Sequence, residues 1–166
     1  MSAVLTTEKA SLVQQVLDHL ADTLRQAEHA AQVAHETATH EENIAENKYD
    51  TLGLEAAYLA TGQARRAEAI RRAIALWRQF RPRVHDAGQG IALGALVCLV
   101  DAAGQQQWLF LGPDGGSMKL ACGDQAVQVI STEAPLGQAL LGKCEGDEVT
   151  LPGAAGRQVF EVLWVK

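Results

Sequence analysis

The sequence lacks the features that mark several large classes of protein. No apolar run approaches the ~18 residues of a membrane span, and the first fifteen residues lack the basic-then-apolar order of a signal peptide. The three cysteines, Cys98, Cys122 and Cys144, lie far apart and form no CxxC pair. This spacing argues against a disulfide framework and against a cysteine zinc site. Together these absences predict a protein of the reduced cytoplasm without a membrane segment.

Positive charge is also scarce. Lysine and arginine number 14 against 20 aspartates and glutamates, which gives a net charge of −6. A protein that binds nucleic acid on its own through phosphate contacts is normally basic, so the balance argues against that class. The 166 residues are 48% apolar, which is enough to bury a core in one ordinary domain or two small ones.

The composition changes near residue 85. Residues 1–85 hold all five histidines and eleven of the twenty acidic residues, with one proline and two glycines. Residues 86–166 hold the other thirteen glycines and three prolines. Because proline and glycine end helical patterns, residues 81–88 are typical of a linker. The chain is predicted to be α+β, with a helical domain over 1–85 and a β-rich domain over 86–166.

The first half contains two apolar stripes at helical spacing. They are Val13, Val16/Leu17, Leu20, Leu24, Ala27, Ala31, Ala34 and Ala38, then Ala57, Ala60, Ala64, Ala67, Ile70, Ile74 and Trp77. Steps of three and four place each stripe on one helix face, and neither helix can bury its stripe alone. The short break between them predicts an antiparallel coiled-coil hairpin with its turn near 41–48.

The second half alternates in the manner of β-strands separated by turn signals. The predicted strands are 91–100, 106–112, 117–121, 126–131, 147–151 and 157–165. Between the fourth and fifth, Pro135 and Gly142 bracket a short helix, since proline favours the first turn and glycine follows the end.

Charge is unevenly distributed along the hairpin. The predicted turn is surrounded by Glu36, Glu41, Glu42, Glu46 and Asp50. The second helix carries Arg65, Arg66, Arg71, Arg72, Arg78, Arg81 and Arg83, opposed only by Glu68. Both groups can be solvated helix faces. However, like charges gathered at one turn repel each other, so a cation brought by a partner is the alternative explanation for the acidic turn.

Three stretches resemble the GreA/GreB family of bacterial transcription elongation factors. The start of the first helix, LTT followed by LDHL at 17–20, resembles the family's start. The turn, IAENKYD at 44–50, resembles the family's hairpin tip. Residues 134–149, APLGQALLGKCEGDEV, resemble the family's Ser-Pro-Leu-x-x-Ala-Leu-Leu-Gly-Lys-x-x-Gly-Asp-x-Val. This last motif is specific. Together with the order of a helical hairpin followed by a β-domain, the resemblance covers almost the whole chain.

The resemblance implies an FKBP-like C-terminal domain that docks on the rim of bacterial RNA polymerase through Glu133, Ala134, Pro135 and Leu136. The hairpin would enter the secondary channel, near the 3′ end of the nascent RNA. Tip carboxylates would share a second Mg²⁺ with the polymerase, because hard oxygen ligands suit that ion. The factor would be a monomer that binds no cofactor stably, is not itself an enzyme, and belongs to a family associated with DNA binding.

The tip departs from the family pattern in two ways. Asn43 stands where the family has aspartate, and the segment between Asn47 and Tyr49 is one residue shorter. Three acids, Glu41, Glu42 and Glu46, remain as candidate metal ligands acting in trans. Three functions therefore stay open: a factor that stimulates cleavage of backtracked RNA, a channel occupant that does not, and a generic coiled-coil adaptor.

Overall fold

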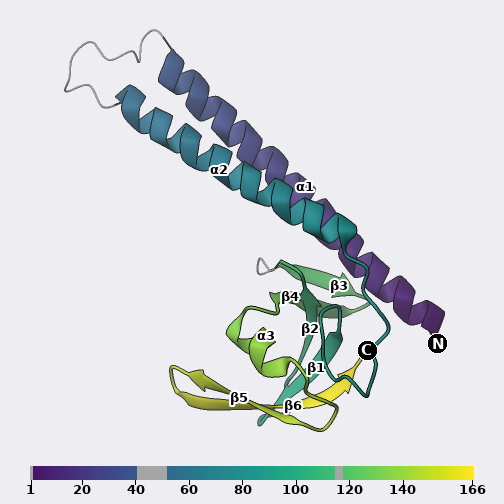
Figure 1. Cartoon of the computed structure of the whole chain (residues 1–166). Helices are drawn as coiled ribbons and strands as arrows, with labels where there is room; N and C mark the ends of the chain where they lie inside the picture. The colour runs from purple at the N-terminus through teal and green to yellow at the C-terminus, as the bar shows by residue number, and fades with distance from the viewer. Residues whose placement is uncertain (1, 41–51, 115–117) are drawn as a thin grey trace. The chain divides into compact units, whose positions relative to one another are not determined.

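The computed structural model describes residues 2–40, 52–114 and 118–166, with side chains throughout except at residues 2–6 and 52. Two long helices come first, α1 (Ser2–Thr39) and α2 (Leu52–Gln79). Figure 1 shows them side by side. Among the described residues, no helix is both long and apolar enough to span a membrane.

The two helices form an antiparallel hairpin, as predicted. Arg71 of α2 binds Glu28 of α1, and farther along the pair His35 and Ala60 line one shared groove. Later residues of α1 thus meet earlier residues of α2. On α1 the predicted stripe is confirmed, since Val16, Leu20, Ala27 and Ala34 are buried.

The predicted stripe on α2 was wrong at two positions. Ala57 and Ala64 are exposed, whereas Ala56 and Gln63 are half-buried. The sheltered face follows alternating steps of four and three: Ala56, Ala60, Gln63, Ala67, Ile70, Ile74 and Trp77. This is the spacing of a coiled-coil seam. Because Gln63 is polar, a pattern based on apolar residues alone predicted the wrong face of the helix at this point.

A six-stranded sheet follows the hairpin. Its strands are β1 (Leu96–Asp101), β2 (Gln106–Gly112), β3 (Lys119–Cys122), β4 (Gln125–Ser131), β5 (Glu148–Gly153) and β6 (Gly156–Val165). The spatial order is β3-β4-β2-β1-β6-β5. Among the described strands, only the β2–β4 pair is parallel. Five of the six predicted strands lie within two residues of their expected bounds, and the α+β class is confirmed.

Both faces of the sheet are covered. On one face the short helix α3 (Pro135–Leu140) packs over a core that includes Leu109, Leu111 and Leu140. On the other, Trp77 at the end of α2 lies 6.2 Å from Phe110, measured between ring centroids. Gly112 makes this contact possible, because a Cβ at that position would collide with the Trp77 indole.

The first predicted strand begins later than expected. Residues 91–95 are turns rather than strand, with Gly90 and Gly94 at φ of 74° and 91°. The Ile91 amide donates to the Lys143 carbonyl, and Gly142 donates back to Ile91. Apolar composition alone could not reveal this loop, because its partners come from about fifty residues later in the chain.

The chain divides into two compact units, residues 1–16 with 76–166, and residues 17–75. This division differs from the domain boundary that the sequence predicts between residues 85 and 86. The reason is that the first turns of α1 and the last turn of α2 pack with the sheet. Gln15 of α1 shows this directly: its side-chain amide donates to the Ala121 carbonyl of edge strand β3 and accepts from the Ala121 N–H, at 2.8 and 2.9 Å.

Candidate functional site

The strongest candidate site is the turn that joins β4 to α3, residues 131–136, called here the 131–136 turn. Ser131 holds it at two points: its Oγ accepts from the Glu133 N–H at 3.0 Å and its carbonyl accepts from the Ala134 N–H at 3.2 Å. Pro135 then begins α3, where its missing N–H costs nothing. Ala134 occupies the cap position without a side-chain hydrogen bond. Short-range bonds therefore fix the backbone of the turn.

The turn presents one acid and one proline to solvent. Glu133 and Pro135 are exposed, whereas Ala134 and Leu136 are half-buried. Leu136 packs against the core beneath α3. Gly137 allows the helix to sit this close, because a Cβ there would collide with the Ser131 carbonyl. An exposed carboxylate and an exposed proline ring on a fixed backbone suit binding to another protein surface. They do not suit catalysis.

The predicted tip residues cannot be compared with the structure. Glu41, Glu42, Asn43, Glu46, Asn47 and Tyr49 lie outside the described residues. Within the described ranges, no three His, Cys, Asp or Glu side chains gather in a way that could hold a metal ion.

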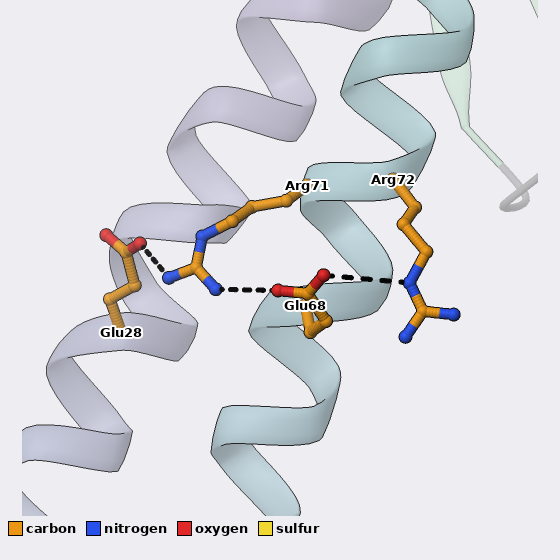
Figure 2. Close-up of polar contacts among 4 residues, drawn as sticks. All are labelled: Glu28, Glu68, Arg71 and Arg72. Atoms are coloured by element: carbon orange, nitrogen blue, oxygen red, sulfur yellow. Dashed lines mark hydrogen bonds and ion pairs between the residues drawn. The ribbon is translucent and has the colours of Figure 1, made fainter.

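The arginines of α2 take part in a polar network across the hairpin, shown in Figure 2. Arg71 donates to Glu28 of α1 at 2.6 Å and to Glu68 at 3.3 Å, and Arg72 lies 3.8 Å from the other Glu68 oxygen. Hydrogen bonds to Glu28, then to Glu68, raise the pKa of the Arg71 guanidinium. All four side chains are about half or more exposed, so the network aligns the helices and adds little stability.

The Glu28 contact corrects the expectation that only Glu68 opposes the arginines. Glu68 is visible from sequence because it lies three and four positions before Arg71 and Arg72. Glu28 lies 43 residues away, on the other helix. No local spacing could have revealed it.

Lys9 is a buried ion that sequence reasoning missed. Only 3% of the residue is exposed, and its ammonium donates to the Arg83 carbonyl at 2.8 Å. Burial lowers the pKa of the Lys9 ammonium to about 8, because a low-dielectric surrounding disfavours the charged form. Lys9 lies three residues before Leu12 and four before Val13, so helical spacing places it on the apolar face of α1. This spacing is the sequence signal that could have indicated its burial.

We expect Lys9 to make stability depend on pH above neutrality. Between pH 8 and about 10.5 the unfolded chain binds more protons than the folded one, so the free energy of unfolding should rise with pH there. The gain should approach about 3 kcal/mol. Urea unfolding at a series of pH values measures it, as the difference between wild type and Lys9→Met. Lys119→Met, which removes an exposed lysine, should keep the wild-type slope; equal slopes for wild type and Lys9→Met would contradict the expectation.

The cysteines differ in their surroundings. Cys98 is buried, Cys122 is half-buried and Cys144 is exposed, and all three are free thiols. Burial raises the pKa of the Cys98 and Cys122 thiols. The Cys144 Sγ lies 3.9 Å from the Ala87 carbonyl.

Comparison with known proteins finds a family match for the part of the chain that contains the 131–136 turn. The family described as "Transcription elongation factor, GreA/GreB, C-term" matches residues 87–166. Residues 87–166, just under half of the chain, are therefore similar to the C-terminal domain of GreA/GreB factors. The predicted Gre-type resemblance is thus confirmed over these residues, and the matched region includes the whole sheet, α3 and the turn before it.

Curated relatives match over the same half. GreA from Maridesulfovibrio salexigens is 35% identical over 80 residues, which cover 47% of this chain and 46% of that protein. GreA from Desulfovibrio desulfuricans is 38% identical over 80 residues, covering 47% and 45%. The matched region thus spans about half the length of these GreA proteins. Among solved structures, GreA factor homolog 1 (Gfh1) of Thermus thermophilus is 21% identical, with a TM-score of 0.37 and coverage of 90% of this chain and 94% of that one.

Proposed function

We propose that this protein is a transcription elongation factor that binds bacterial RNA polymerase and acts through its helical hairpin in the secondary channel. The observation that carries the proposal is the GreA/GreB match over residues 87–166, which contains the exposed and rigidly held Glu133 and Pro135. Relatives that match this domain are named transcription elongation factors. The 131–136 turn would dock on the rim of the polymerase.

The hairpin would deliver carboxylates to chemistry that the polymerase performs. The sequence between α1 and α2 carries Glu41, Glu42 and Glu46, and carboxylate oxygens are the ligands that Mg²⁺ prefers. A second Mg²⁺ held there would activate water and stabilise the leaving oxygen when backtracked RNA is hydrolysed. The protein would supply ligands in trans, which agrees with a function that needs no catalytic pocket of its own.

A second candidate is a channel occupant that does not stimulate cleavage. Asn43 favours it, because a neutral amide stands where the family pattern has a charged metal ligand, and the shorter segment before Tyr49 favours it too. Such a factor would alter initiation or pausing by occupying the channel.

The experiment that separates the two candidates is RNA cleavage in a backtracked elongation complex. The full chain is added to polymerase stalled on a defined template, and shortening of the labelled transcript is followed over time. Cleavage above the intrinsic rate supports the first candidate. Binding to polymerase with altered pausing but no added cleavage supports the second, and absence of polymerase binding contradicts both.

The docking assignment predicts that Glu133→Arg combined with Pro135→Ala weakens polymerase binding by on the order of tenfold. Reversing a charge at a contact and removing the proline ring remove favourable interactions of about 1–2 kcal/mol together. Fluorescence titration of the core enzyme measures the affinity.

The matched control is Asp124→Arg, an equal charge reversal at an exposed turn. Asp124 precedes β4, whereas the 131–136 turn follows it, so the control tests the opposite end of one strand. Urea unfolding should give similar stabilities for all variants, because Glu133, Pro135 and Asp124 are exposed. Unchanged affinity in the double variant, or an equal loss in Asp124→Arg, would contradict docking through this turn.

A further inference from the structure

A cavity beside the buried lysine has a markedly one-sided charge. Its volume is about 130 Å³, and it lies between the first turns of α1, the segment after α2 and the end of β6. Four of its seven lining residues are basic, and none is acidic. The basic residues are Lys9, Arg83, His85 and Lys166, and the remaining walls are Pro82, Val84 and Val165.

Lys9 is the buried donor at this cavity. Its ammonium has three N–H groups, and the Arg83 carbonyl accepts from one of them. Among the described residues, no carboxylate lies within ion-pair distance of Lys9. A buried charge without a counter-ion is costly, so an anion that entered the cavity would gain attraction that the protein itself does not satisfy.

The positive field extends beyond the cavity. An adjoining groove shares Lys9, Arg83 and His85 and adds Arg81 and one acid, Asp86. The Asp86 carboxylate accepts from the Gly88 N–H at 2.9 Å. At the other end, the Lys166 ammonium lies 4.9 Å from the centre of the Trp164 ring. Among the side chains that line the cavity and the groove, one carboxylate thus stands against four Lys or Arg side chains and one histidine.

We propose that this cavity binds the phosphate group of a small anion, either inorganic phosphate or a phosphate monoester. The buried Lys9 ammonium is a donor of the kind that phosphate oxygens accept, and Arg83 and His85 line the same cavity with further N–H groups on their side chains. Hydrogen bonds between a cation and a phosphate are strong. The volume of about 130 Å³ suits one phosphate group. The site is independent of the 131–136 turn and of the proposed action on RNA.

The experiment is titration of the full chain with sodium phosphate at constant ionic strength, with sodium chloride as the reference. Binding is measured by calorimetry and by the rise in melting temperature. We expect saturable binding of phosphate and none of chloride. Lys9→Met and Arg83→Gln should each weaken phosphate binding by about tenfold, the effect of losing one charged hydrogen bond.

Two variants keep the test decisive. Arg83→Gln changes an exposed side chain and retains the backbone carbonyl that Lys9 binds, so it should fold even if Lys9→Met does not. Lys119→Met removes an exposed lysine of β3 that lines neither the cavity nor the adjoining groove, and it should bind phosphate like wild type.

A parallel titration with glycerol 3-phosphate separates the two sources of the phosphate group. Tighter binding than inorganic phosphate supports a monoester, and equal binding supports the free ion. Absence of saturable binding to either compound overturns the proposal. So does binding that Arg83→Gln leaves unchanged, or binding that Lys119→Met weakens equally.

Discussion

Replacing Glu41, Glu42 and Glu46 together by alanine should slow stimulated cleavage of backtracked RNA by on the order of 10²–10³-fold, while affinity for polymerase stays within about twofold. Removing well-placed electrostatic groups at a reacting centre costs rates of this size. The affinity should persist because the 131–136 turn and the hairpin sides, not the tip, would supply most of the contact. Single-turnover cleavage with saturating factor separates the rate from the affinity.

Two further variants make this test specific to the tip. Glu36→Ala with Glu55→Ala removes two exposed acids from the flanking helices and should leave cleavage near the wild-type rate. Asn43→Asp should raise the rate, since it restores the acid of the family pattern. Equal and robust cleavage by wild type and the triple variant would rule out metal delivery by the tip. Equal inertness in cleavage, with retained binding, would favour the non-cleaving channel occupant.

Replacing Trp77 by alanine should lower the free energy of unfolding by about 3–5 kcal/mol, the usual cost of deleting a large buried aromatic side chain. Trp77 is fully buried, and its ring lies 5.5 Å from Phe80 and 6.2 Å from Phe110. Its indole N–H donates to the Asp114 carbonyl at 3.2 Å. The substitution would leave a cavity between the end of α2 and the sheet, beside a glycine that cannot fill it.

Urea unfolding followed by the fluorescence of Trp108 and Trp164 measures this loss in the sheet. Tyr58→Ala is the control, because Tyr58 lies on α2 with 69% of its surface exposed. Its stability should stay within about 0.5 kcal/mol of wild type. A loss below about 1 kcal/mol for Trp77→Ala would show that the end of α2 does not contribute to the stability of the sheet.

The docking candidates form one group in the sequence, because they lie in one contiguous motif. The four candidates are consecutive in the sequence, so they lie close together in any fold: Glu133, Ala134, Pro135 and Leu136. What the motif could not reveal is which of them face solvent. That depends on Leu136 reaching the core beneath α3 and on Gly137 approaching the Ser131 carbonyl, both of which follow from packing.

By itself the sequence determined what is local: the break in composition near residue 85, the two helices, five of the six strands, and the helix begun by Pro135. These features depend on periodicity and on turn residues, which act over a few positions. Only the tertiary structure decided where polar groups find their partners. Lys9 meets the Arg83 carbonyl across 74 residues, and Gln15 meets the edge of β3 across 106. Lysine and glutamine also occur on exposed helix faces, so their residue type does not predict that they are buried or which distant group they bind. Their burial and their partners result from the packing of whole helices and strands, which no local pattern encodes.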